Sequence, residues 1–419
     1  MDYIEINNDQ EEQNKKKKRK KNNEGSAIFL IGLAVGIALS LIVLLVASGG
    51  KLFVLTNGDS VVTSKTIQKI NGLTSLIDES YYKADEVTEE QLQDGLYKGL
   101  VEALDDPYSV YYTKDEIEEL EESISGTFSG IGAYVSADET TGYPMIVSVI
   151  EGSPAEEAGL LSGDILYEVD GESLQGVDLD VAVSKIKGEE GTSVHLTIVR
   201  SGEADYLEFD IVRAQVDSET VYGEMLEDDI GYIQITEFDD VSCDQFVPIL
   251  EELIEEGMEG LILDLRDNPG GTVDSVTDIA EYLVPEGLVF YMEYPDGTRE
   301  EYEVDGEQAV DVPIVVLING NSASASEILS SAIQDSGAGI LVGTTTYGKG
   351  VVQTIYSLSG DSGAVKLTTA QYYTRNGHDI NEVGIEPDVE VELDAEAYLE
   401  DGTDTQLEEA INEIKKRME

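Results

Sequence analysis

The sequence is poor in the residues that build metal sites and disulfides. Its 419 residues include two histidines, His195 and His378, one cysteine, Cys243, and no tryptophan. A single cysteine cannot form a disulfide within the chain, and the absence of a Cys and His cluster argues against a zinc site. Cys243 follows Asp239 and Asp240, and carboxylates near a thiol make it a poor nucleophile. We expect no metal and no cofactor.

Positive charge is also scarce. There are 25 Lys and Arg residues against 87 Asp and Glu residues, which gives a net charge of -62. A chain of this charge repels the phosphates of nucleic acids, so we expect no nucleic-acid partner. Seven of the basic residues form one block, Lys15–Lys21 (KKKKRKK), within the segment 1–25.

A long uncharged run follows this basic block. Residues 26–48 (SAIFLIGLAVGIALSLIVLLVAS) contain no charged side chain, and a helix of this length spans the apolar core of a bilayer. Basic residues stay on the cytoplasmic side. The sequence therefore predicts a cytoplasmic tail over 1–25, a single-pass anchor in the cell membrane over 26–48, and an extracytoplasmic remainder. A cleaved signal peptide is the alternative, because small residues end the run, although such peptides have shorter apolar cores.

Four regions with different patterns follow the apolar run. Residues 64–122 show apolar side chains at helical spacing, and residues 125–215 combine short β-rich pieces with two short helices. Residues 220–395 alternate buried strands with helices, and a charged helix over 404–417 closes the chain. The predicted fold class is α+β multidomain, with an N-terminal transmembrane helix, a helical region, and a β-rich domain inserted before an α/β core.

Residues 125–215 resemble a PDZ domain, a peptide-binding module. The resemblance rests on three segments, which are Gly130-Ile131-Gly132-Ala133, Ser153–Leu160 (SPAEEAGL) and Gly163–Gly171 (GDILYEVDG). Glycines beside a strand leave backbone N–H groups open to a peptide's C-terminal carboxylate, and the peptide then adds as a strand. We expect the segment Gly130, Ile131, Gly132 and Ala133 to bind such a C-terminus. The alternative is that these glycines only form a turn.

The segment 343–353 (GTTTYGKGVVQ) nearly matches the nucleotide-binding pattern GxxxxGK[ST]. Gly350 stands where the final Ser or Thr should be, and phosphate binding needs a helix after the lysine. Residues 351–356 are instead β-branched and aromatic, which is typical of a strand. Lys349 is then either a surface lysine in a hairpin turn or, between two glycines, a partly buried lysine. Burial favours the neutral amine, which can act as a general base.

A segment of small residues offers a partner for Lys349. It reads Gly320–Glu327 (GNSASASE) and joins a predicted buried strand to a predicted helix. The start of that helix directs N–H groups at a developing oxyanion, and a serine there can be a nucleophile. Because histidine is nearly absent, a Ser–Lys pair is the variant that remains. Alternatively, the serines only cap the helix, and composition does not choose among Ser322, Ser324 and Ser326.

Several motifs together resemble the carboxyl-terminal processing peptidases, which are tail-specific serine proteases with a PDZ domain. The matching motifs, spread over roughly residues 65–395, are DPYS (106–109), GYI (231–233), DLRDNPGG (264–271), SASASE (322–327), GKG (348–350) with Gln353, and GIEPD (384–388). The resemblance implies that Ser324 is the nucleophile and Lys349 the base. It also implies that Gln353 orients the lysine. The N–H groups of Gly270 and Ala325 then correspond to the oxyanion hole.

The same resemblance implies the function and the partners. It implies a membrane-anchored, extracytoplasmic serine endopeptidase that captures the free C-termini of protein or peptide substrates through its PDZ domain. It also implies homodimers formed through the helical ends, residues 64–122 and 404–417. Lys187 departs from the pattern, because some relatives have an Arg there that is linked to substrate sensing, and a lysine cannot make the same bidentate contact. The alternative function is a catalytically silent PDZ scaffold that binds peptides.

Overall fold

The computed structural model describes residues 61–138, 140–359 and 363–418. The chain divides into two compact units, residues 1–88 and 89–419. The described part of the first unit contains α2 (Ser64–Ser80) and the short helix η1 (Ala84–Glu86). The hydroxyl of Thr63 caps α2 by accepting a hydrogen bond from the N–H of Thr66.

The second unit begins with a helix, a strand and a helix. These are α3 (Glu89–Glu102), β1 (Val110–Tyr112) and α4 (Lys114–Ser125). Thr113 starts α4 with a reciprocal capping box, which prevents the preceding strand from continuing. Strand β1 pairs with β18 (Ala364–Thr374), so this early segment is attached to a hairpin near the end of the chain.

A β-rich domain follows α4. Its elements in chain order are β2 (Thr127–Gly130), β3 (Ala133–Asp138), β4 (Tyr143–Val149), α5 (Pro154–Ala158), β5 (Ile165–Val169), β6 (Glu172–Ser173), α6 (Leu179–Ile186), β7 (Ser193–Val199), β8 (Leu207–Val212) and β9 (Ala214–Asp217). One sheet has the order β3-β4-β5-β7-β8, with β6 beside β5, and β2 pairs with β9. Its core contains Leu166 and Ile198, which have no exposed surface. Strand β3 ends the sheet, so one of its edges carries no strand.

The helix boundaries in this domain follow the local sequence. Helix α5 begins at Pro154, directly after its N-cap Ser153. The prediction that a second helix stops with Gly188 as the residue after its C-cap is confirmed, because α6 ends at Ile186 and Lys187 is its C-cap. The guanidinium of Arg213 donates hydrogen bonds to the carbonyls of Lys185 and Ile186 and so satisfies the helix end. A partner so distant in sequence cannot be recognised from the helix itself.

The α/β core begins at Val221. Its elements in chain order are β10 (Val221–Met225), η2 (Glu227–Asp229), β11 (Ile230–Ile235), α7 (Ser242–Glu256), β12 (Gly260–Asp264), α8 (Val273–Leu283), β13 (Gly287–Glu293), β14 (Arg299–Val304), β15 (Ile314–Ile318), α9 (Ala325–Ser336), β16 (Gly339–Gly343), β17 (Val351–Ser357), β18, β19 (Val389–Glu390), α10 (Ala395–Asp401) and α11 (Thr405–Met418). The main sheet has the order β10-β11-β12-β15-β16-β19 and is parallel except at β10. Strands β1, β13, β14, β17 and β18 form a second, antiparallel sheet.

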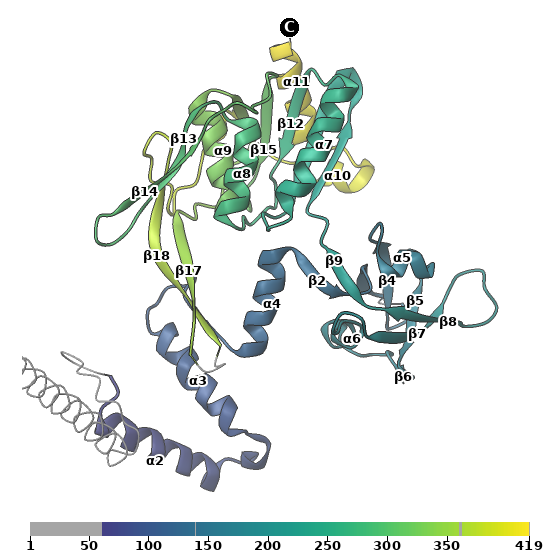
Figure 1. The fold of residues 1–419 in the computed structure, drawn as a ribbon, viewed down its shortest axis with the longest axis vertical. Helices are drawn as coiled ribbons and strands as arrows, with labels where there is room; N and C mark the ends of the chain where they lie inside the picture. The colour runs from purple at the N-terminus through teal and green to yellow at the C-terminus, as the bar shows by residue number, and fades with distance from the viewer. Residues whose placement is uncertain (1–60, 139, 360–362, 419) are drawn as a thin grey trace, which may run out of the picture. The chain divides into compact units, whose positions relative to one another are not determined.

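Helices cover both faces of the main sheet, which explains its continuous apolar strands. Every residue of β12 and β15 is buried, as expected for parallel strands between two helical layers. Helices α7, α8 and α9 pack on one face and α11 on the other (Figure 1), where Ala410 and Ile414 have no exposed surface. The buried strands predicted over 261–265, 314–318 and 338–342 are confirmed within one residue.

The prediction of a single-pass membrane protein is contradicted. Within residues 61–138, 140–359 and 363–418, no helix is both long enough and apolar enough to cross a bilayer. The predicted tail (1–25) and anchor (26–48) lie outside the described residues. The membrane location is therefore not retained.

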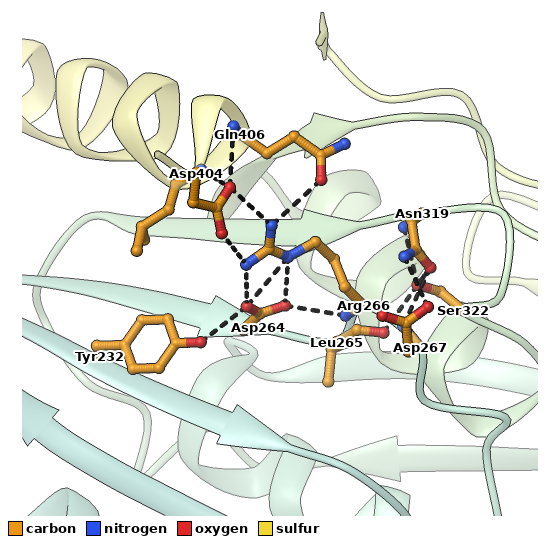
Figure 2. Close-up of polar contacts among 10 residues, drawn as sticks. Tyr232, Asp264, Leu265, Arg266, Asp267, Asn319, Ser322, Asp404 and Gln406 are labelled. Atoms are coloured by element: carbon orange, nitrogen blue, oxygen red, sulfur yellow. Dashed lines mark hydrogen bonds and ion pairs between the residues drawn. The ribbon is translucent and has the colours of Figure 1, made fainter. Parts of the chain in front are cut away.

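A cluster of charges joins the last helix to the main sheet (Figure 2). The guanidinium of Arg266, just after β12, lies 2.6 Å from Asp264 Oδ2 and 2.9 Å from Asp404 Oδ2. The hydroxyl of Tyr232 donates to Asp264, and Arg266 also donates to the side-chain carbonyl of Gln406. Asp264 has no exposed surface. Its buried carboxylate therefore depends on Arg266 for a counter-charge.

Replacing Arg266 by Met should lower the free energy of unfolding by about 3–5 kcal/mol, because it leaves the buried carboxylate of Asp264 without a cation. The matched control is Lys416→Met. The Lys416 side chain is 62% exposed, and its partner Glu413 keeps an ion pair with Arg417, so the control should change stability by less than about 1 kcal/mol. Chemical denaturation measures both variants. Equal stability of parent, variant and control would contradict the proposed dependence.

Candidate active site

Three turns lie at one end of the main sheet. They follow the carboxyl ends of the neighbouring parallel strands β12, β15 and β16. In open α/β sheets, ligands bind in the crevice beyond these ends. Gly270, Ser324 and Lys349 each belong to a different one of the three turns. The topology thus brings together residues that are far apart in the sequence.

The first two turns are tied together by hydrogen bonds (Figure 2). The N–H of Asp267 donates to Asn319 Oδ1, and Asn319 Nδ2 donates back to Asp267 Oδ1, both at 3.0 Å. The hydroxyl of Ser322 donates to the carbonyl of Leu265 at 2.8 Å. These bonds hold the turn after β12 against the turn that leads into α9.

The hydrogen bonds also separate the roles of the three serines that composition left equivalent. Ser322 and Ser326 have no exposed surface. Their hydroxyls donate to carbonyls of the first turn, Ser322 to Leu265 and Ser326 to Asn268. Ser324 is half-buried and lines a cavity. Two of the serines therefore stabilise the turn, and Ser324 alone of the three is placed to meet a ligand.

Ser324 has a strained backbone. Its φ and ψ are 55° and -114°, directly before the first residue of α9, and a non-glycine residue rarely adopts this conformation. The hydroxyl of Tyr372 donates to the Ser324 carbonyl at 3.2 Å, and the Ser324 N–H donates to Glu327 Oε2 at 2.9 Å. These two hydrogen bonds hold Ser324 in its strained conformation at the N-terminus of α9.

Glu327 connects the serine turn to the lysine turn. Its carboxylate has no exposed surface and accepts four hydrogen bonds. Oε2 accepts from the N–H groups of Ser324 and Lys349, both at 2.9 Å. Oε1 accepts from Thr346 Oγ1 at 2.6 Å and from the Gly348 N–H at 2.7 Å. One buried side chain therefore sets the backbone positions of both predicted dyad residues.

Lys349 lies two residues before β17 and has a glycine on each side. A Cβ atom at Gly348 would lie 2.8 Å from the backbone nitrogen of Gly384, and one at Gly350 would lie 2.7 Å from that of Asn381. Only glycine allows the chain to approach so closely. Residues 351–357 form β17 and not a helix, so the local structure that a phosphate-binding loop requires does not follow this lysine.

The electrostatic setting of Lys349 favours its neutral amine. Burial lowers the pKa of Lys349, the positive charge of Lys366 lowers it further, and the carboxylate of Glu327 opposes both effects. The Lys349 ammonium lies 5.1 Å from the centre of the Tyr108 ring, in the DPYS segment. Burial also raises the pKa of Tyr108 to about 12.

A cavity of about 300 Å³ unites the predicted catalytic side chains. It is lined by Ser324, Ala325, Lys349 and Gln353, together with Gly271, Phe238, Tyr372 and side chains of α4. In the described part of the chain, no hydrogen bond joins Ser324 to Lys349 or Lys349 to Gln353. The amide of Gln353 donates instead to Thr368 Oγ1 at 3.3 Å. Ser324, Lys349 and Gln353 thus line one cavity, but in the described residues no hydrogen bonds connect their side chains to one another.

The two predicted oxyanion donors differ in their surroundings. The N–H of Ala325, the first residue of α9, donates to no group among the described residues and belongs to the cavity lining. The N–H of Gly270 donates to Asn268 Oδ1 at 2.8 Å. A Cβ atom at Gly270 would lie 2.7 Å from the Ser324 Cβ. Gly270 is thus beside the serine, although its N–H is engaged within its own turn.

The sequence did not predict that Glu327 accepts hydrogen bonds from both turns. It predicted that Cys243 is a poor nucleophile from its acidic neighbours, but burial is the larger cause. Glu327 appeared only as part of the helix start, although its position three residues after Ser324 is the capping-box spacing. Burial is the main cause that raises the pKa of the Cys243 thiol to about 11, and Asp278 and Asp244 add to it. Such a thiol is not a nucleophile at neutral pH.

A second cavity, of about 260 Å³, lies between β3 and α6 of the β-rich domain. Gly130, Ile131, Gly132 and Ala133 line it, together with the apolar side chains of Phe128, Val135, Val183 and Ile186. It borders the open edge of β3, where an extended peptide can pair with the strand. Lys187 also lines this groove and pairs with Glu122 of α4 at 2.7 Å.

Comparison with known proteins assigns the chain to a family. The profile of Peptidase family S41 matches residues 229–391, and the PDZ domain profile matches residues 145–200. A profile described as the activating protease CtpB N-terminal domain matches residues 51–116. The carboxy-terminal processing protease CtpA of Bacillus subtilis is 37% identical over 367 residues, which cover 86% of this chain and 77% of that protein. The chain belongs to the carboxyl-terminal processing protease family.

Other relatives agree with this assignment. The carboxyl-terminal-processing protease of Synechocystis is 35% identical, over 75% of this chain and 74% of its own. The carboxy-terminal processing protease CtpB of Bacillus subtilis is 36% identical, over 78% of this chain and 68% of its own. The protein is therefore a serine-type peptidase with a PDZ domain, which acts on peptides or proteins, and the family resemblance seen in the sequence is confirmed. The catalytically silent scaffold is disfavoured.

Replacing Glu327 by Gln should lower kcat of the protease by about 100-fold, because an amide presents N–H donors to backbone N–H groups and loosens both turns. KM should change less than twofold, since Glu327 does not line the cavity. The matched control is Glu252→Gln, which changes the same charge at an exposed site on α7. A kcat within twofold of the parent, for a variant with parental circular dichroism, would refute this role.

Proposed function

We propose that the protease cleaves peptide bonds with a dyad in which Ser324 is the nucleophile and Lys349 the general base. One observation carries the proposal. Ser324 lines the same cavity as Lys349, a partly buried lysine whose pKa is lowered. Two glycines let that lysine stand close to other backbone. Among the described residues that line this cavity there is no histidine and no cysteine.

The dyad accounts for each proton in the reaction. Neutral Lys349 takes the proton of the Ser324 hydroxyl as the oxygen attacks the substrate carbonyl. The lysine then gives this proton to the leaving amine, and water hydrolyses the acyl-enzyme by the same route in reverse. The N–H of Ala325 at the start of α9 supports the oxyanion. Gly270 can add a second donor once its N–H leaves Asn268, and Gln353 can orient the lysine once it leaves Thr368.

Ser324→Ala and Lys349→Ala should each abolish cleavage of an unstructured protein substrate, because each removes one partner of the proton transfer. A fluorophosphonate probe should label the parent at Ser324 and should not label Ser324→Ala, as located by mass spectrometry. Ser336→Ala and Lys415→Ala, outside the cavity, are the matched controls and should keep full activity. Normal turnover by either dyad variant would reject the mechanism. Absence of labelling and cleavage in the parent would favour the silent scaffold.

We further propose that the PDZ groove binds the free C-terminus of a substrate. Three features support this role. The groove is lined by mostly apolar side chains, it borders the open edge of β3, and it contains the glycine-flanked segment Gly130–Ala133. Backbone N–H groups near these glycines can hold a carboxylate, and apolar side chains suit an apolar last residue. The exposed apolar residues Ile67, Leu73 and Leu76 of α2 support the further expectation of a homodimer through the helical ends.

A peptide with an apolar last residue and a free carboxylate should bind at least about 10-fold tighter than its C-terminal amide, because the amide removes the charged acceptor. Val183→Asp in the groove should weaken the free peptide by a similar factor. The matched control is Val181→Asp on the same helix, at a side chain 46% exposed and outside the groove. Calorimetry measures both peptides against the parent and against each of the two variants. Equal affinity for acid and amide would reject recognition of the C-terminus.

A further inference from the structure

A second lysine lines the catalytic cavity. Lys366 lies on β18, opposite Ile355 of β17 in the register of the strand pair, and belongs to the same cavity lining as Lys349. Successive side chains of a strand alternate between its faces. Lys366 therefore shares its face with Thr368, which accepts the Gln353 hydrogen bond. Tyr372, which donates to the Ser324 carbonyl, lies beyond a register shift in the strand pair and lines the same cavity.

The two lysines are held in matching ways. The Lys366 ammonium lies 5.3 Å from the centre of the Tyr112 ring, and the Lys349 ammonium lies 5.1 Å from that of Tyr108. Both rings come from one short segment, whose strand β1 pairs with β18. A cation over a tyrosine ring is attracted by the negative face of the ring. Among the described residues, Lys366 makes no ion pair with a carboxylate.

Several charged and titratable groups surround Lys349, and Lys366 is the cation among them. The groups that line the cavity or contact the two lysines are Lys366, Glu327, Glu237, Tyr108, Tyr112 and Tyr372. Glu327 and the Tyr108 ring favour a charged Lys349. Burial and Lys366 oppose it. Glu237 lines the same cavity; burial raises its pKa, and the charge of Asp239 raises it further.

We propose that Lys366 is a positioning residue of the protease, whose fixed positive charge disfavours a second positive charge on Lys349 and so maintains the neutral amine that acts as base. This inference rests on the proposed Ser324–Lys349 dyad. The physical reason is that two like charges around one water-poor cavity repel each other more strongly than in bulk water. A lysine beside another cation is a known way to activate an amine.

The test is the pH dependence of kcat/KM in Lys366→Gln, with cleavage of an unstructured protein as the assay. Loss of the cation lets Lys349 hold its proton to a higher pH, so the acid limb should move upward by about one pH unit. Activity at a pH on that limb should fall about 10-fold, and activity on the alkaline plateau should stay within twofold of the parent. Lys366→Arg keeps the charge and should restore the parental profile.

Three further measurements make the outcome specific. Lys366→Met keeps the apolar stem and serves as the second charge-removing variant if the Gln variant does not fold, as judged by its melting curve. Lys415→Gln on α11 changes the net charge equally at a distant, exposed site and should leave the profile unchanged. The rate at which a fluorophosphonate labels Ser324 should show the same shift, without any contribution from substrate binding.

Three outcomes would overturn the inference. A parental pH profile in folded Lys366→Gln rejects it and leaves the dyad intact. A raised KM with an unmoved acid limb assigns Lys366 to binding a substrate carboxylate. A profile that Lys366→Arg fails to restore points to packing and not to charge. The dyad itself fails separately, when Ser324→Ala or Lys349→Ala keeps its activity.

Discussion

The carboxylate of Glu327 is the interaction on which the rest of the catalytic region depends. It is buried and accepts hydrogen bonds from three backbone N–H groups and one hydroxyl, drawn from two turns. Without it, those backbone donors would lie in the interior with no acceptor, which costs free energy for each group. Its two oxygens therefore hold Ser324 and Lys349 at one cavity, although the two residues come from different elements.

Two basic residues line the cavity although the chain as a whole is strongly acidic. The protein has a net charge of -62, yet two lysines line the cavity that contains Ser324. An acidic protein stabilises protonated amines through its general field, so a neutral lysine needs local conditions that oppose the field. Burial and the charge of Lys366 supply those conditions for Lys349. The strained backbone of Ser324 is maintained by bonds from Tyr372 and to Glu327.

Sequence patterns predicted the parts of the fold that depend on local periodicity. Strands β12 and β15 are continuous apolar runs, which only burial on both faces permits. The β-branched residues after Lys349 predicted the strand β17, and a strand at this position argues against a nucleotide-binding loop. Gly188 predicted the end of α6, but the bonds that Arg213 donates to the carbonyls of Lys185 and Ile186 could not be predicted from the helix itself. The hydrogen bond from the Gly270 N–H to Asn268 Oδ1 also could not be predicted, since it depends on the rotamer of Asn268.

Residue content by itself narrowed the catalytic chemistry that we propose. The chain has only two histidines and one cysteine, so a serine together with a lysine between two glycines remained as the proposed catalytic pair. The tertiary structure decided which serine is available and which second lysine enters the cavity. Ser322 and Ser326 bond to carbonyls of the turn after β12, and Lys366 arrives by strand pairing. A hydroxyl's partner is set by segments that meet only when the sheet assembles, so no local pattern contains this information.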